Sequence, residues 1–464
     1  MSGLEFAGEY TLREMKILTS AGNVIDIKRL TQTIEIFEDI NSPSLSGNIT
    51  LIDIDNIIEN APVIGQEYLS LVITTPTIEE EKLNFGENVF AIYKVMERVD
   101  VSNNAQSITL SFCSPELLRS NRTRVSKSYT ANIDTTVENV LRDSRFINTR
   151  KELFLEPTAG VRKVIAPNIR PFTFIRNLLD EAISTKYGSP HFFFYENTKG
   201  IHFRTLQSMY AEGTMAEFNT GDLETLETNG PTRTRPNPEN VFQRVLSFSV
   251  NNSRDMLLNA RGGMLGSKMI SHNIYHKKVT NVSFNYFNEF ENYPRIDENP
   301  IYNNNRIDQE DNTIGSFPDA RIFVHSTSSQ ATLQDRQYDD SNGNYPYATT
   351  RVPITIQERS SKLLELNYGV NISMRVTGNT TLAVGQLINL IVPVTGRIHE
   401  KENDEYMTGK YLITKLRHIF SEPDRTHEVA FNAVKDSLPK EYPINDDSRE
   451  PFGPKSESAE LSYT

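Results

Sequence analysis

The sequence predicts a mainly β protein in which two antiparallel β-barrels flank an α+β middle domain. Runs that alternate polar and apolar residues, as half-buried strands do, dominate both ends of the 464-residue chain. Helical spacing replaces this alternation after residue 119. A Gly-Gln turn followed by strands occurs twice, at Gly65 and at Gly385. These observations predict two related β units separated by a domain of different architecture.

Residues 1–118 are expected to form the first barrel, with about five to seven antiparallel strands. Asn41-Ser42-Pro43 and Gly86-Glu87-Asn88 are predicted as turns between strands. Three strand-like runs precede the first Gly-Gln turn: 15–18, 33–37 and 48–51.

Residues 119–236 form the predicted middle domain. Thr135 and Glu138 have the spacing of a capping box at the start of one helix, and Pro171 stands where a second helix is expected to begin. The stretch His191–Arg204 then predicts a β-hairpin. Its three consecutive phenylalanines indicate a buried strand rather than a binding surface.

The second barrel is assigned to residues 237–284 and 351–438, with a helix at 354–366. Residues 285–350 are rich in Asn, Asp, Tyr and Gly and are expected to form a polar inserted lobe. Residues 439–464 are rich in Pro, Ser and charged residues, which predicts a flexible tail that orders on a partner.

The two β units are expected to be copies of one another. After each Gly-Gln turn, residues 90–95 correspond to 411–416, and residues 108–112 correspond to 429–433. Four turn residues carry this prediction, and their role is structural: Gly65, Gln66, Gly385 and Gln386.

Composition narrows the classes of function. The chain has 48 Lys and Arg against 60 Asp and Glu, a net charge of -12, so a tight grip on nucleic acid is not expected. Cys113 is the single cysteine, which excludes a disulfide framework and a cysteine-based metal site. The start of the chain lacks a secretory pattern, and the longest apolar stretch, 384–394, is too short for a membrane span. No membrane anchor is therefore expected.

No catalytic, cofactor-binding or metal-binding residue is predicted, so the chain is not expected to be an enzyme. His272 and His276 are four residues apart, but no Glu follows the first and the neighbouring residues alternate as in a strand. The acidic run 79–81 is expected in a solvated loop rather than in a glycosidase carboxylate pair. The glycines of 262–268 lack the spacing of a phosphate-binding loop.

Two segments resemble parts of a known family. Residues 167–179, with the run Arg170-Pro171-Phe172-Thr173-Phe174, lead into the hairpin His191–Arg204 as in the middle domain of baseplate hub proteins from contractile-tailed bacteriophages. The C-terminal order of helix, strand, Gly385-Gln386 turn and the run Gly409–His418 is similar to the same family. The hub half of type VI secretion spike proteins is similar as well.

This resemblance implies a homotrimeric ring with two tail-tube-like barrels per subunit. Its six barrels would match a sixfold tail tube above, while a separate threefold cell-puncturing spike docks below. It also implies a place in the virion's tail baseplate, assembled in the host cytoplasm, with a channel through which DNA passes without specific binding. The 285–350 lobe would contact other baseplate (wedge) proteins. An acidic channel wall is expected, because phosphate contacts would slow the DNA.

One alternative of another class remains open. A virion-associated protein that binds or cleaves glycan would use the Tyr and Asn side chains of the 285–350 lobe, since these stack on sugars and hydrogen-bond to them. The same side chains also suit a protein contact, so composition does not decide between the two.

Overall fold

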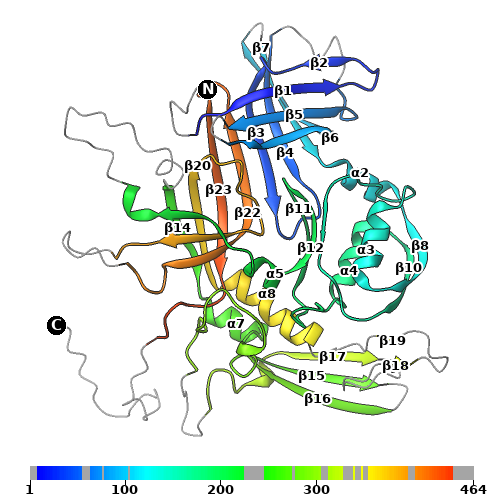
Figure 1. Cartoon of the computed structure of the whole chain (residues 1–464), viewed down its shortest axis with the longest axis vertical. Helices are drawn as coiled ribbons and strands as arrows, with labels where there is room; N and C mark the ends of the chain where they lie inside the picture. The colour runs from blue at the N-terminus through cyan, green and yellow to red at the C-terminus, as the bar shows by residue number, and fades with distance from the viewer. Residues whose placement is uncertain are drawn as a thin grey trace.

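The computed structural model describes the following residues: 8–54, 63–75, 78–102, 105–223, 245–273, 277–304, 312–327, 338–339, 346–347, 354–394 and 403–442. Over these ranges the chain is mainly β, as predicted, and antiparallel pairing dominates its largest sheet (Figure 1).

One thirteen-stranded sheet runs through both ends of the chain. Its main path is β14-β20-β23-β22-β3-β4-β7-β6-β5-β1-β2, and β21 joins it by pairing with β22 and with β13. The strands from the N-terminal part are β1 (Thr11–Leu18), β2 (Val24–Asp26), β3 (Thr31–Asp39), β4 (Ser46–Asp53), β5 (Tyr68–Thr75), β6 (Ile78–Ser102) and β7 (Ala105–Cys113). The later strands are β13 (Thr214–Asn219), β14 (Val245–Ser253), β20 (Val370–Thr377), β21 (Leu387–Ile391), β22 (Gly409–Ser421) and β23 (Thr426–Lys435).

The two predicted β units are joined edge to edge within the chain. Residues 33–39 of β3 pair antiparallel with residues 415–421 of β22. Because β22 occupies the outer edge of β3, the described ladders form one continuous sheet and do not by themselves close either unit as a separate barrel.

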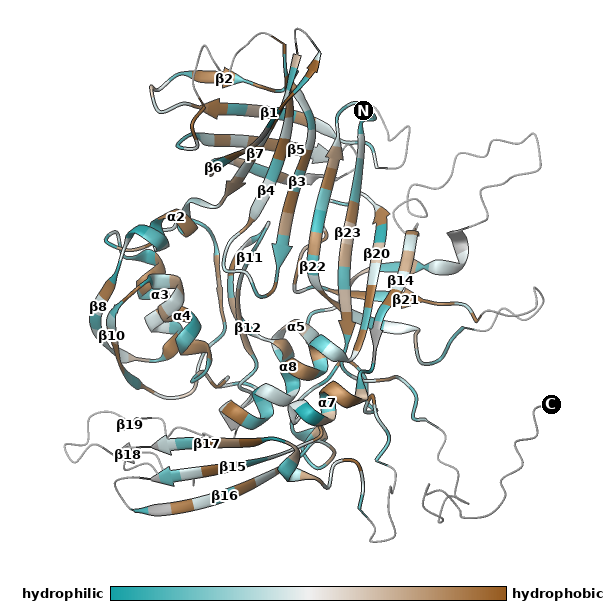
Figure 2. Cartoon of the chain, turned by 180° about the vertical axis from the view of Figure 1, so that it is seen from behind, coloured by the Kyte–Doolittle hydropathy of each residue, from teal (hydrophilic) through white to brown (hydrophobic). Residues whose placement is uncertain are grey.

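Several strands of the large sheet, such as β3, β4 and β23, bury alternate side chains, and hydrophilic and hydrophobic residues alternate along them (Figure 2). On β3, for example, Ile34 and Ile36 are fully buried, while Glu35 and Phe37 on the opposite face are half-buried. The cores of the two units meet at the β3–β22 pair, since Phe420 of β22 belongs to the core of the first unit. The joint therefore excludes water on its apolar side.

Between residues 115 and 223 the chain forms four α-helices and a β-hairpin among its elements. Helix α4 begins at Pro171, and Phe192, Phe193 and Phe194 are buried in the hairpin. The expected capping box is wrong, because helix α3 begins at Ile133 and places Thr135 inside its first turn. The elements are α2 (Pro115–Arg122), β8 (Val125–Ala131), α3 (Ile133–Arg142), β9 (Leu153–Leu155), β10 (Arg162–Ile169), α4 (Pro171–Leu179), β11 (Phe192–Asn197), β12 (Gly200–Thr205), α5 (Leu206–Tyr210) and the short 3-10 helix η1 (Thr220–Leu223).

A second, three-stranded sheet lies below α7 and α8 in Figure 1 and is separate from the large sheet. Its strands β15 and β16 fall within residues 237–284, which were expected in the second barrel, yet they pair with β17 and with each other. The lobe therefore starts before residue 285. The elements between residues 256 and 368 are α7 (Met256–Gly262), β15 (Gly266–Asn273), β16 (Lys278–Asn285), η2 (Phe290–Asn292), η3 (Pro318–Ala320), β17 (Ile322–Thr327), β18 (Tyr338–Asp339), β19 (Pro346–Tyr347), the π-helix η4 (Ile354–Glu358) and α8 (Arg359–Tyr368).

The start of the predicted polar lobe packs into the second unit rather than extending from it. Tyr286, Phe290 and Ile301 are buried in the core of that unit. Arg295 donates to both carboxylate oxygens of Glu365 at 2.9 Å, and Lys362 joins Glu365 to Asp436. Two cations and two carboxylates are thus buried together, which satisfies their charges inside the fold. Most of the predicted tail, from residue 443 onward, lies outside the described residues.

Candidate functional site: the repeated β unit

The large sheet contains the same five-strand order twice. In the first unit the order is β3-β4-β7-β6-β5, and in the second unit it is β14-β20-β23-β22-β21. In each unit the last three strands along the chain form a meander, and the strand before them pairs with the end of that meander. The sequence-based prediction of two related units therefore matches the strand order of the described residues.

The registers of the two units also agree over the first part of the β6–β7 and β22–β23 ladders, before β6 shifts again between Val95 and Arg98. In the first unit Ile92 lies opposite Phe112 and Val95 opposite Leu110, with an irregularity between Ile92 and Lys94. In the second unit Ile413 lies opposite Ala433 and Leu416 opposite Phe431, with the same irregularity between Ile413 and Lys415. An inserted bulge residue re-aims the following strand, so its recurrence at the equivalent point gives both units the same local bend.

A second shared irregularity lies at the start of each unit. The β3–β4 ladder shifts register between Thr31 and Thr33, and the β14–β20 ladder shifts between Val245 and Ser247. Strand order, register and bulge positions thus all identify β14 as the counterpart of β3.

A hydrogen-bonded serine–asparagine pair occurs in both units, with its two members on exchanged strands. The Ser111 hydroxyl donates to Asn48 Oδ1 at 2.9 Å across β4 and β7, and the Ser373 hydroxyl donates to Asn432 Oδ1 at 2.7 Å across β20 and β23. The serine and asparagine have changed strands while the hydrogen bond is kept.

Side-chain size is exchanged in the next pair of residues. Gly47 lies opposite Phe112, and a Cβ atom at Gly47 would stand 2.2 Å from the Phe112 ring. In the second unit Ile372 lies opposite Ala433. Each unit thus combines one small and one large side chain, which keeps the local volume filled.

The predicted turn residues occupy the equivalent loop of each unit. Gly65 and Gly385 both have left-handed backbone conformations, with φ of 91° and 88°. Glycine adopts this conformation without the steric cost that other residues meet. Both glycines therefore adopt a conformation that favours glycine at this turn.

The sequence comparison matched Gln66 with Gln386, and this match is wrong by one residue. Ile92 N donates to Glu67 O at 2.8 Å, and the equivalent Ile413 N donates to Gln386 O at 2.9 Å. The Glu67 carboxylate accepts from Ile64 N, and the Gln386 amide oxygen accepts from Ala383 N three residues back in the same way. Gln386 therefore corresponds to Glu67, while Gln66 is exposed.

A buried carboxylate joins both units to the middle domain. Glu38, at the end of β3, accepts from Val384 N at 2.8 Å beside the Gly385 turn and from Thr198 N at 3.1 Å in the hairpin turn. Asn197 completes the contact by donating to Val384 O at 3.1 Å. Nothing in the sequence pattern marked Glu38, because its partners lie about 160 and 346 residues away.

Burial raises the pKa of Glu38 to about 7, although the two backbone donors act in the opposite direction. Ionisation of Glu38 therefore places a desolvated negative charge at the junction of the three parts, which destabilises the junction.

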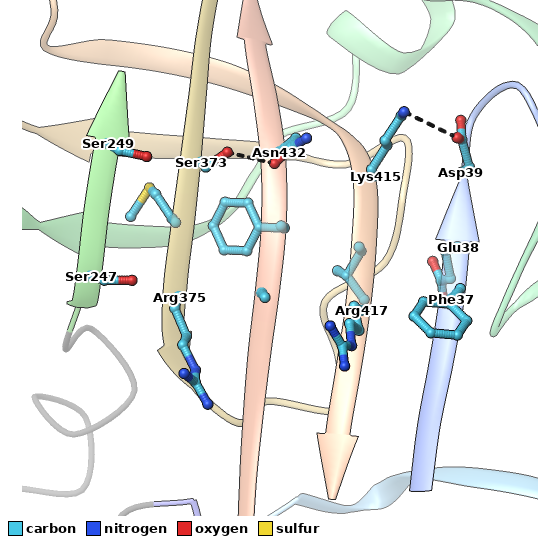
Figure 3. A pocket seen from close by; sticks show the side chains of 14 residues that line it. Phe37, Glu38, Asp39, Ser247, Ser249, Ser373, Arg375, Lys415, Arg417 and Asn432 are labelled. Carbon is cyan, nitrogen blue, oxygen red and sulfur yellow. Dashed lines mark hydrogen bonds and ion pairs between the residues drawn. The ribbon is translucent and has the colours of Figure 1, made fainter. Parts of the chain in front are cut away.

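A hollow of about 530 Å³ lies on the polar face where the two units meet (Figure 3). Lys415 lies 3.7 Å from Asp39, Arg417 pairs with Glu35, and Arg375 pairs with Glu428. Three cations in or beside the hollow are therefore each paired with a carboxylate on a neighbouring strand.

The residues considered for enzyme chemistry are separated from one another. His272 is exposed on β15, while His276 lies outside the described residues. The acidic run 79–81 lies in β6 and not in the expected loop. Gly263 ends α7 in a left-handed conformation, which accounts for one glycine of the 262–268 run. His202 stacks between Phe154 and Tyr195.

The described ranges lack two further features. They contain no group of three or more His, Cys, Asp or Glu side chains placed to hold a metal ion. Their helices are all too short or too polar to span a membrane.

Known proteins were compared with the chain by sequence and by structure. No family model and no curated protein sequence matches it. A tail protein of Neisseria meningitidis aligns over 94% of this chain and 100% of its own, with 9% identity and a TM-score of 0.49. A 43 kDa tail protein of prophage MuSo2 from Shewanella oneidensis aligns over 91% and 98%, with 10% identity and a TM-score of 0.49. An E. coli type VI secretion component aligns over 94% and 79%, with 14% identity and a TM-score of 0.41. At these scores we treat all three as likenesses only.

Exchanging the Asn48 and Ser111 side chains tests the equivalence of the units. Each single substitution, Asn48→Ser or Ser111→Asn, should cost about 1 kcal/mol in the free energy of unfolding, because the cross-strand hydrogen bond is lost. The double variant recreates the arrangement of Ser373 and Asn432 and should recover to within about 0.5 kcal/mol of wild type. Urea unfolding measures all four proteins. A double variant as unstable as the sum of the singles would contradict the equivalence.

The Glu38 junction predicts a specific pH dependence. An unfolded glutamate has a pKa near 4.5, so between pH 4.5 and 7 the folded chain holds a proton that the unfolded chain releases. Stability from this group should therefore fall by up to about 3 kcal/mol as pH rises through that window. The Glu38→Gln variant should lack this component in urea unfolding, whereas the exposed control Glu405→Gln should keep it. Equal pH slopes in wild type and Glu38→Gln would refute this assignment.

Proposed function

We propose that this chain is the structural hub of a contractile-tail baseplate. Three copies form a ring that connects a sixfold tail tube to a threefold spike and leaves a central channel for DNA. The proposal rests on one observation above all, the repetition of strand order, register and bulge positions in the two units.

Duplication supplies what a symmetry adaptor needs. A ring of three identical chains has three equivalent positions, so it can meet a sixfold partner only if each chain offers two near-equivalent surfaces. The two units share their backbone course while their side chains differ, as at Gly47 and Ile372. Equivalent backbones suit contact with a repeating tube, and different side chains suit neighbours that are not equivalent.

The polar face of the large sheet is the proposed channel wall. Its opposite face is already filled by the apolar cores, so only this face can meet water and a polar molecule in transit. The charged residues that line the hollow of Figure 3 are Arg375, Lys415, Arg417, Glu38 and Asp39, which is not the acidic lining expected. Each cation there is held by a carboxylate, which reduces its attraction for phosphate groups.

The remaining parts of the chain suit contacts outside the ring, and no catalytic role is proposed. The three-stranded lobe sheet exposes Val279, Ile322 and Val324, and we assign it to other baseplate (wedge) proteins. The spike is a separate chain below the ring, and the location is the virion's tail baseplate. The glycan-directed alternative has no specific support from the described residues of the lobe.

Measurement of the assembly state tests the hub proposal. The purified chain, alone or with its spike, should sediment as three chains, and this particle should bind the end of tail tubes in pull-down. A chain that stays monomeric beside its spike would contradict the proposal. Release of sugar fragments from cell-wall glycan by the isolated chain would instead favour the alternative function.

A further inference from the structure

The β3–β22 ladder joins the two units within one chain, and it indicates how a unit of one chain would pair with a unit of the next chain. In this joint, β3 of the first unit pairs antiparallel with residues 415–421 of β22 in the second unit. The counterpart of β3 is β14, and the counterpart of β22 is β6, by strand order and register. A repeat of the same joint therefore needs β14 on one side and β6 on the other.

Both counterparts have an edge without a strand partner among the described residues, although the short helix η1 contacts β14. β14 is the end strand of the large sheet and pairs with β20 alone. β6 pairs with β5 only as far as Ala91, and beyond this point its ladder is with β7 on one side. The corresponding stretch of β22 is the one that β3 covers. The duplicated fold thus repeats both halves of the joint and leaves them on opposite sides of the large sheet (Figure 1).

Apolar side chains mark the uncovered part of β6. Tyr93, Met96, Val99 and Val101 are 48%, 45%, 54% and 59% exposed, and Val250 of β14 is 42% exposed. A long uncovered strand with apolar side chains promotes pairing with another chain unless it is protected. Here the duplication identifies the complementary edge, which belongs to a second copy.

We propose that β14 of one copy pairs antiparallel with the stretch of β6 that follows Ala91 in the next copy, in the register of the β3–β22 joint. The inference rests on the proposed ring. The contact is head to tail, and a head-to-tail contact gives a closed ring only when the rotation from copy to copy adds up to a full turn. Added as a strand, β14 gives main-chain hydrogen bonds to the open edge of β6 and covers its apolar residues. The large sheet then continues from copy to copy around the ring.

The internal joint also sets the register between copies. Glu35 of β3 lies opposite Ile419 of β22. The counterpart of Glu35 is Ser249, since Glu35 faces Asn48 and Ser249 faces Ser373. The counterpart of Ile419 is Val99, since Ile419 faces Glu428 and Val99 faces the equivalent Ser107. This match takes in one extra irregularity of β6, between Val95 and Arg98, so the proposed register applies from Arg98 onward. Val99 of one copy should therefore lie directly opposite Ser249 of the next.

Cysteine cross-linking of the full chain tests this register. Directly opposed residues of antiparallel strands have Cα atoms about 4.5–5.5 Å apart, within the range that a disulfide spans. Under mild oxidation, the Val99→Cys/Ser249→Cys variant should shift most of the protein from the one-chain band to bands of two and three chains on a non-reducing gel. Each single variant should stay in the one-chain band, because Cys113 is buried.

A matched control uses Val99→Cys with Ser247→Cys, on the same strand and the same face but two residues out of register. It should cross-link much less, because its Cα atoms would lie beyond about 7 Å. Three-chain particles that do not cross-link through Val99 and Ser249 would overturn the proposed contact and leave the hub function intact. Equal cross-linking of both pairs would also overturn the register. A protein that stays monomeric would refute both the contact and the hub.

Discussion

The fold depends on one strand being paired on both sides. β3 bonds to β4 of its own unit and to β22 of the other, and this second ladder converts two units into a single sheet. The pairing aligns the two apolar cores, since Phe420 crosses from β22 into the core of the first unit. It also brings Glu38 to the point where both units and the hairpin of the middle domain meet. Without β22, the edge of β3 would be exposed along with the apolar side chains beneath it.

Local patterns in the sequence were sufficient to predict the parts but not how they join. Alternation predicted the strands, and Pro171 predicted the start of α4, because both depend on neighbouring residues. The β3–β22 pair joins residues more than 370 positions apart, and no local preference encodes such a contact. Strands β15 and β16 alternate like barrel strands, so only their partner β17 shows that they belong to the lobe.

The repeat itself was visible in the sequence, but its alignment was not. The Gly-Gln identity placed Gln66 opposite Gln386, whereas the backbone hydrogen bonds of Ile92 and Ile413 make Glu67 the counterpart. A one-residue difference in the turn is compatible with the same strands, because only the strands have a fixed register. The exchanged pairs, Ser111 with Asn48 and Asn432 with Ser373, leave no identity to detect. The strand register is therefore similar in the two units although the residues at equivalent positions differ.

The central claim is that one chain supplies two equivalent sectors of a ring. End-on electron micrographs of the isolated oligomer test it most directly, through the rotational symmetry of the averaged image. The account predicts threefold symmetry for the whole particle with a strong sixfold component at the radius of the large sheet. A closed ring with threefold symmetry and no sixfold component there, or a particle with twofold symmetry, would contradict it.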